Sequence, residues 1–116
     1  MTALASSDRL AAALAHLAET IDARAAGSDS AKSWTAKLLA RGPGACADKV
    51  AEEGGEFAQA VRGESEARVA GEAADVVYHV LVALRSRGVS LDDVAAALEA
   101  RQGTSGIDEK AGRKGN

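Results

Sequence analysis

Apolar side chains recur every three or four positions along most of the chain, which is the spacing that gathers them on one face of an α-helix. Leu10, Leu14, Leu17 and Ile21 show this spacing in the first segment. Gly, Pro and Ser residues interrupt the pattern, and the interruptions predict five helices, over residues 8–26, 33–40, 43–62, 65–87 and 91–101. Residues 102–116 have no apolar periodicity, so we predict a mobile C-terminal tail there.

The third and fourth predicted helices form the centre of the expected fold. Pro43 suits the first turn of a helix, where its missing N–H would have no partner, and Gly63 followed by Ser65 combines a C-cap with a new N-cap. Such a short connection makes the two helices antiparallel neighbours. The stretch VVYHVLVAL (76–84) is apolar nearly all round, which is typical of a buried central helix. The pattern therefore predicts an all-α helical bundle centred on an antiparallel hairpin.

Composition adds an expectation about assembly. The 116 residues have room for one domain, 1–116, of which about 8–101 is helical. Twelve are Gly, and Trp, Tyr, Phe, Met, Pro and Cys occur once each, so alanine and short aliphatic residues must form the core. Because small domains bury a limited share of their surface, we expect a homodimer that shares the apolar helix faces.

Charge and motif content exclude several classes of protein. A formal net charge of −3 disfavours nucleic-acid binding. The first residues lack the pattern of a signal peptide, and no apolar run is long enough to cross a membrane, so we expect a cytoplasmic protein with no membrane partner. Cys46 has no second cysteine for an internal disulfide, and the chain holds too few Cys and His residues for a structural zinc site.

The spacing of the acidic residues is the most informative feature. Glu53 and Glu56 lie three residues apart on the third helix, and Glu72 and Asp75 do the same on the fourth. The antiparallel hairpin places the two pairs opposite each other, where their charges repel unless a cation lies between them. Hard divalent cations prefer oxygen ligands, which points to Mg²⁺. For any single residue a solvated helix face is the simpler interpretation, but this interpretation weakens for the whole set.

These acids belong to a pattern that resembles a known family. Glu53-x-x-Glu56, fifteen residues and Glu72-x-x-Asp75 resemble the signature of the all-α, MazG-type nucleotide pyrophosphohydrolases. The stretches SWTAKLLARGP (33–43), KVAEEGGE (49–56), EAADVVYHVLVAL (72–84) and RQGTSGIDEKAGR (101–113) are similar to the phosphoribosyl-ATP pyrophosphatases of histidine biosynthesis. The resemblance implies a MazG-like fold and Mg²⁺-dependent hydrolysis of N1-(5-phosphoribosyl)-ATP to phosphoribosyl-AMP and pyrophosphate, the second step of histidine biosynthesis.

The resemblance also implies residue roles. It places Glu53, Glu56, Glu72 and Asp75 on the metal-binding acids. Glu52 falls on the companion acid before them, which is either a further ligand or the base that orients the attacking water; we count all five as catalytic. The family more often has Ala-Val or a similar pair where this chain has Gly54-Gly55.

A substrate with several phosphates also needs cationic side chains, and Lys37, Lys49 and Arg101 are the candidates. Lys37 lies in the shared SWTAKL stretch, although composition alone makes it an exposed helix charge. Lys49 either binds phosphate or forms an ordinary i,i+4 pair with Glu53. Residues 105–106 of the tail offer a backbone nest for phosphate, or belong to a disordered segment.

Three further positions have two interpretations each. Trp34 either stacks on adenine or packs in the core. His79, four residues after Asp75, is expected to hydrogen-bond to an acid rather than to bind metal. The helix-interior pair Gly54-Gly55 either permits close approach of a helix or substrate, or is a tolerated defect that costs about 1 kcal/mol per glycine.

Two other functions remain as alternatives. A MazG-like house-cleaning pyrophosphohydrolase of non-standard nucleoside triphosphates would use the same acids, but it has no evident need of the SWTAKL and GTSGIDEK stretches. A non-catalytic helical dimerisation module would use none of them and would not be stabilised by Mg²⁺.

Overall fold

The computed structural model describes residues 4, 7–27 and 33–103. Within these residues the chain forms five helices: α1 (Asp8–Ala26), α2 (Trp34–Arg41), α3 (Pro43–Gly63), α4 (Glu66–Ser86) and α5 (Leu91–Ala100). They agree with the predicted ranges to within one or two residues at each end, and the all-α class is confirmed. The predicted tail, residues 105–106 included, lies almost wholly outside the described residues.

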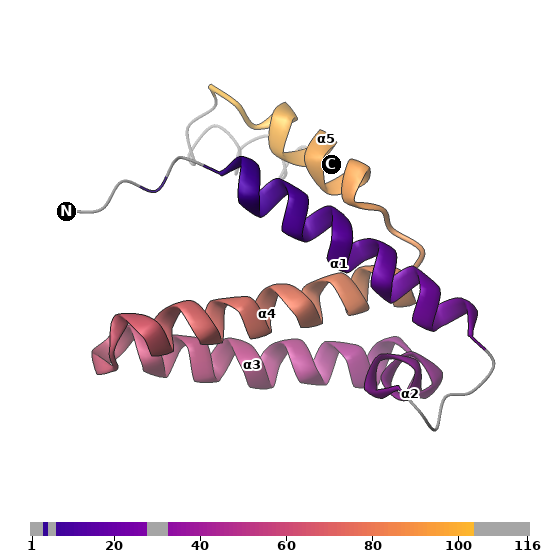
Figure 1. The fold of residues 1–116 in the computed structure, drawn as a ribbon, viewed down its shortest axis with the longest axis horizontal. Helices are drawn as coiled ribbons and strands as arrows, with labels where there is room; N and C mark the ends of the chain where they lie inside the picture. The colour runs from indigo at the N-terminus through magenta and orange to yellow at the C-terminus, as the bar shows by residue number, and fades with distance from the viewer. Residues whose placement is uncertain (1–3, 5–6, 28–32, 104–116) are drawn as a thin grey trace, which may run out of the picture.

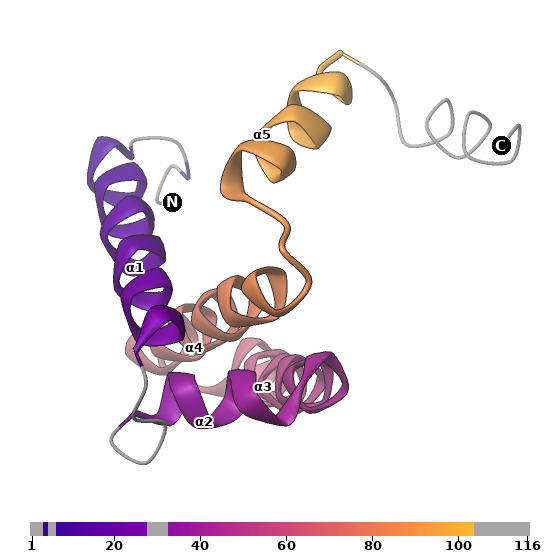
Figure 2. The same cartoon turned by 90° about the vertical axis from the view of Figure 1, so that its right-hand side faces the viewer.

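Helices α3 and α4 lie side by side as an antiparallel hairpin, as Figure 1 shows, and these two helices share the most extensive helix–helix contact. Helix α2 packs against α3 and α4, and α1 packs against α2 and α4. Figure 2 shows α1 and α5 on the α4 side of the hairpin, diverging from each other as they leave it. The hairpin therefore has α2 packed at one of its ends and two splayed helices on its α4 side.

Local capping explains where the helices begin. The Ser33 hydroxyl accepts a hydrogen bond from the N–H of Ala36, and the Ser65 hydroxyl accepts one from the N–H of Arg68. At α5, Ser90 and Asp93 form a reciprocal capping box. Ser7 occupies the N-cap position of α1, but its side chain makes no capping hydrogen bond. Side-chain oxygens thus satisfy N–H groups at three of the helix starts.

The buried core is small and aliphatic. Its apolar cluster is formed by Ile21, Leu38, Cys46, Leu81 and Val82, which come from α1, α2, α3 and α4. Cys46 is 1 % exposed, in agreement with a structural role for this thiol. None of the described helices has the length and apolar character needed to cross a membrane.

An apolar groove remains open between α1 and α4. Leu10 at its edge is 54 % exposed, and Leu98 on α5 is 59 % exposed. Helix α5 contributes no buried residue at all. The residues that line the groove are Leu10, Ala13, Leu14, Leu17, Ala70, Ala73, Ala74 and Val77. The α1–α4 groove is thus an apolar surface that the described residues leave uncovered.

Candidate metal centre

Three carboxylates converge between the two helices of the hairpin. Glu53 and Glu56 come from α3 and Glu72 from α4, and one oxygen of each lies within 4.8 Å of the others. Glu53 and Glu72 are buried, whereas Glu56 is exposed. The Oε2 atoms of Glu53 and Glu72 are both buried and have no hydrogen-bond partner among the described residues. Buried carboxylate oxygens without a partner are costly, which makes this cluster a candidate site for a cation.

The other two predicted acids lie beside this cluster rather than in it. Asp75 is exposed on α4, one turn after Glu72, and is not part of the group that meets within 4.8 Å. The Glu52 side chain is 56 % exposed and is held by Lys49. The structure therefore brings together three of the four predicted ligands, with Asp75 and Glu52 at the margin.

Lys49 supplies positive charge on the α3 side of the cluster. Its Nζ lies 3.1 Å from Glu52 Oε2 and 3.7 Å from Glu53 Oε1. The hydrogen bond with Glu52, together with the negative charges of Glu52, Glu53 and Glu56, raises the pKa of Lys49. The ordinary i,i+4 pair that the sequence allowed is thus present, and it places an ammonium next to a buried acid of the cluster.

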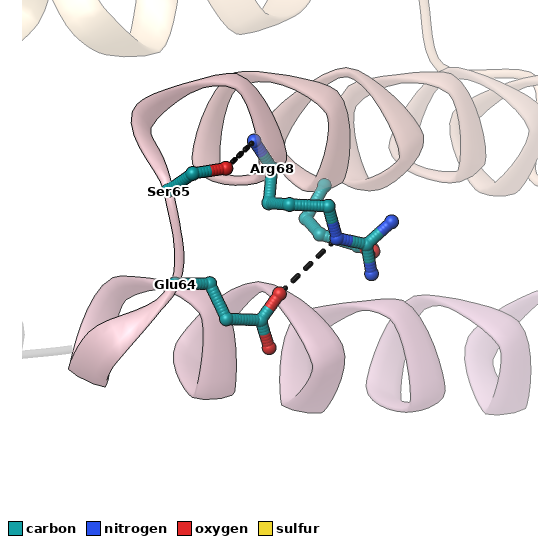
Figure 3. Close-up of polar contacts among 4 residues, drawn as sticks. Glu64, Ser65 and Arg68 are labelled. Atoms are coloured by element: carbon teal, nitrogen blue, oxygen red, sulfur yellow. Dashed lines mark hydrogen bonds and ion pairs between the residues drawn. The ribbon is translucent and has the colours of Figure 1, made fainter.

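Arg68 supplies positive charge on the α4 side, and the sequence analysis did not single it out. Figure 3 shows its side chain reaching from α4 toward Glu64, whose Oε1 lies 3.2 Å from Arg68 Nε. Its Nη2 donates a 2.9 Å hydrogen bond to Glu72 Oε1. The bond with Glu64 and the charge of Glu72 raise the pKa of Arg68. The i,i+4 spacing of Arg68 and Glu72 was a signal that could have revealed this residue.

Mutual repulsion among the acids is visible in Glu56. A hydrogen bond with Glu53 and the negative charge of Glu53 raise the pKa of Glu56, and the charge of Glu52 adds to this effect. A hydrogen bond between two carboxyl groups requires that one of them keep its proton. Glu56 thus keeps its proton to higher pH than an isolated glutamate does.

The remaining predicted phosphate ligands come from other helices than the acid cluster. Lys37 is exposed on α2 and makes no ion pair with the described acids. Arg101 is the C-cap residue of α5, a helix that has no extensive contact with α3.

His79 differs from its expected role. Its Nδ1 lies 2.8 Å from the main-chain oxygen of Asp75 rather than from a carboxylate. Because a carbonyl oxygen only accepts, Nδ1 donates this bond and Nε2 is left as an acceptor in the neutral ring. Nε2 is buried and has no partner among the described residues. His79 therefore stabilises α4 below the acids instead of orienting one of them.

Gly54 and Gly55 lie between the acids of α3 without contacting another helix. A Cβ added at either position would meet no described atom within 4 Å. Close helix packing is therefore not the reason for these glycines, which leaves substrate approach or a tolerated defect.

The donor set suits magnesium. Hard cations such as Mg²⁺ are bound by carboxylate oxygens together with water and phosphate oxygens. Glu53, Glu56 and Glu72 offer oxygens only, from two helices that are fixed relative to each other by their long contact. Two of these three residues also have a buried carboxylate oxygen without a partner among the described residues.

Comparison with known proteins decides the family. The family model described as phosphoribosyl-ATP pyrophosphohydrolase matches residues 14–102, which include the whole acid cluster. The chain belongs to this family.

Relatives named phosphoribosyl-ATP pyrophosphatase support the assignment over nearly their full length. The protein of Cereibacter sphaeroides (strain ATCC 17029 / ATH 2.4.9) is 59% identical over 101 residues, 86% of this chain and 96% of the relative. The protein of Jannaschia sp. (strain CCS1) is 54% identical over 86% of this chain and 97% of its own length. That of Paracoccus denitrificans (strain Pd 1222) is 54% identical over 87% and 93%.

Family membership confirms that the chain is an enzyme, a hydrolase of the pyrophosphatase type. It removes the alternative of a non-catalytic dimerisation module.

Proposed function

We propose that this protein hydrolyses N1-(5-phosphoribosyl)-ATP to phosphoribosyl-AMP and pyrophosphate in a Mg²⁺-dependent reaction, the second step of histidine biosynthesis in the cytoplasm. The observation that carries the proposal is the convergence of Glu53, Glu56 and Glu72 within 4.8 Å, in a chain whose family is named for this substrate. In the reaction a water oxygen attacks the α-phosphorus, the bond to the oxygen that bridges the α- and β-phosphates breaks, and pyrophosphate leaves.

The three converging carboxylates are the proposed metal ligands. Bound Mg²⁺ neutralises phosphate charge and acidifies a coordinated water. Asp75 is proposed as the fourth ligand, because it shares a helix face with Glu72 one turn further along α4. Glu52 lies outside the converging group and is exposed, so we assign to it the orientation of the attacking water rather than metal binding.

Cationic side chains on both helices are the proposed phosphate ligands. Lys49 and Arg68 pair with Glu53 and Glu72, and with these acids holding a metal ion the ammonium and the guanidinium would be available for phosphate oxygens. Lys37 and Arg101 are proposed to join them when the substrate is bound. Arg68 is the addition that the structure suggests.

A homodimer is proposed for the apolar surface. The α1–α4 groove and the exposed Leu98 of α5 are the apolar area that a second copy would cover. Light scattering coupled to size exclusion measures the mass in solution. We expect a dimer for the wild type and a monomer for Leu10→Glu, with Leu4→Glu as the matched control because Leu4 is 101% exposed and outside the groove. A monomeric wild type contradicts this assignment.

The activity is tested by incubating the purified protein with phosphoribosyl-ATP and Mg²⁺ and measuring released pyrophosphate and phosphoribosyl-AMP. Glu56→Gln is expected to abolish release. Glu66→Gln removes an exposed carboxylate of the same helix pair outside the cluster and is expected to preserve it. Full activity of Glu56→Gln would overturn the metal assignment.

A panel of standard and non-standard nucleoside triphosphates, assayed side by side, tests the house-cleaning alternative. We expect phosphoribosyl-ATP to be hydrolysed with the highest kcat/KM. Faster turnover of a nucleoside triphosphate would favour the alternative.

A further inference from the structure

Trp34 is an exposed aromatic ring on a firmly held helix. It is the only tryptophan of the chain and begins α2, where its side chain is 45% exposed. The next residue, Thr35, is buried and shares a hydrogen bond with the Tyr78 hydroxyl of α4. The ring is therefore partly open to solvent, on a helix whose next residue is anchored to α4. A large aromatic side chain presented in this way is typical of a binding surface.

Two cations gather at the ring. The Arg41 guanidinium carbon lies 5.6 Å from the ring centroid, and Lys49 Nζ lies 5.8 Å from it. Both distances are within the range of cation–π attraction, in which the negative face of an aromatic ring attracts positive charge. Arg41 follows on the same helix and Lys49 comes from α3, so side chains of two elements bring positive charge to one indole.

The ring lies next to the proposed metal centre. The same Lys49 ammonium that lies by the ring is 3.7 Å from Glu53 Oε1, a member of the acid cluster. A single ammonium group thus spans the distance between the indole and the carboxylates. A nucleotide whose phosphates lie at the acids has Trp34 within reach of its base.

We propose that Trp34 binds the N1-substituted adenine of the substrate through a cation–π contact and thereby distinguishes phosphoribosyl-ATP from ATP. The inference rests on the proposed function, because that substrate carries a ribosyl group on N1. A substituent on N1 gives the adenine ring a positive charge at neutral pH, whereas the adenine of ATP is neutral. The electron-rich indole favours the charged ring over the neutral one.

The cations already at the ring fit this role. The charged base takes the place of one of them, and the displaced side chain is then free for the negative phosphates of the same substrate. The indole therefore keeps a positive group at its face, now the base of the substrate. The displaced side chain pairs with the negative phosphates of the same substrate. ATP has a neutral base, so it offers phosphates to the cationic side chains but no positive group to the indole.

The test uses the single tryptophan as its own probe. N1-methyladenosine 5′-monophosphate and AMP are titrated into the metal-free wild-type protein while Trp34 fluorescence is followed. We expect N1-methyl-AMP to quench the fluorescence and to bind about tenfold more tightly than AMP at neutral pH. The preference is expected to vanish at alkaline pH, where N1-methyladenine loses its proton and becomes neutral. Equal affinities at neutral pH, or no quenching, would overturn the inference.

Variants separate recognition from a structural role. Binding of both nucleotides to Trp34→Phe and Trp34→Leu is measured by calorimetry. We expect Trp34→Phe to retain part of the preference for N1-methyl-AMP and Trp34→Leu to lose it, with KM for phosphoribosyl-ATP raised about tenfold and kcat nearly unchanged. If Trp34 were only structural, Trp34→Leu would weaken binding of both nucleotides equally.

The two proposals fail separately. Selective quenching without pyrophosphate release by the wild type would refute the proposed reaction and leave a site for N1-charged purine nucleotides. Pyrophosphate release with an unchanged KM in Trp34→Leu would refute the role of Trp34 and leave the reaction standing.

Discussion

Replacing Glu72 by glutamine removes one of the three converging charges with almost no change in volume. Glu72 is 6% exposed, and its Oε1 accepts the bond from Arg68 while its Oε2 has no partner among the described residues. The amide oxygen can still accept from Arg68, whose side chain is 65% exposed, so solvent screening keeps the cost of the lost ion pair small. Glu72→Gln is therefore expected to fold, and its main effect is on the metal.

The size of this effect follows from linkage. If Mg²⁺ is added at about 100 times its Kd, binding to the native state stabilises the wild type by about 2.7 kcal/mol. For a chain of this length that corresponds to a Tm increase of about 10 °C. If the loss of one ligand weakens Mg²⁺ binding about 100-fold, Mg²⁺ is present at a concentration near its Kd. Binding then stabilises the native state by only about 0.4 kcal/mol. The Tm increase should fall to about 2 °C.

Differential scanning calorimetry with and without Mg²⁺ measures both shifts. Glu66→Gln is the matched control, since Glu66 is an exposed acid in the first turn of α4 and is not part of the acid cluster. Its Tm without metal is expected to fall slightly because its charge favours the helix N-terminus, but its Mg²⁺-dependent increase should equal that of the wild type. If Glu72→Gln keeps more than half of the wild-type increase, the cluster is not the metal site.

Three smaller changes test other parts of the structure. Glu56→Gln should raise the Tm of the metal-free protein, and the increase should grow as pH rises through the raised pKa of Glu56. The reason is that the wild type then gains a negative charge at Glu56, which Glu53 repels, whereas glutamine stays neutral. If the substitution leaves the Tm in chelator unchanged at all pH values, this prediction is contradicted. Gly55→Ala should stabilise α3 by about 1 kcal/mol in denaturant unfolding, since the added methyl meets open space, and a simultaneous increase in KM would show that substrate approaches there. Ser90→Ala removes the bond to the Asp93 N–H and should cost α5 about 1 kcal/mol, seen as faster amide exchange confined to that helix; unchanged exchange would refute the cap.

The helices were predictable because single residues determine where each helix begins or ends. Ser65 and Ser90 carry capping hydroxyls, Pro43 begins α3, and Gly88 with a φ of +69° follows α4. Each of these choices acts within four residues of its own position, so no knowledge of packing is required. The antiparallel arrangement of α3 and α4 followed from the short connection alone.

The acid cluster was predictable only in part. The i,i+3 spacing placed Glu53 with Glu56, and the hairpin brought Glu72 opposite them, as in the structure. The pattern could not separate Asp75 from this group, because helical spacing fixes the face of a residue but not how far its carboxylate reaches across the gap. The cations at Trp34 depend on packing of α2 against α3, which no local spacing encodes.

Lys49 and Arg68 partly neutralise the acid cluster. Each acid-bearing helix carries a cation four residues before a buried glutamate, Lys49 before Glu53 and Arg68 before Glu72. This order, with the cation nearer the helix N-terminus, is the weaker one for i,i+4 pairs. Helix stability alone therefore does not explain why the cation precedes the glutamate in both helices. A weak pair is, however, easily exchanged, so carboxylates that hold a divalent cation would leave both side chains available for phosphate oxygens. The charges that stabilise the metal-free fold are then the same charges that the proposed reaction requires.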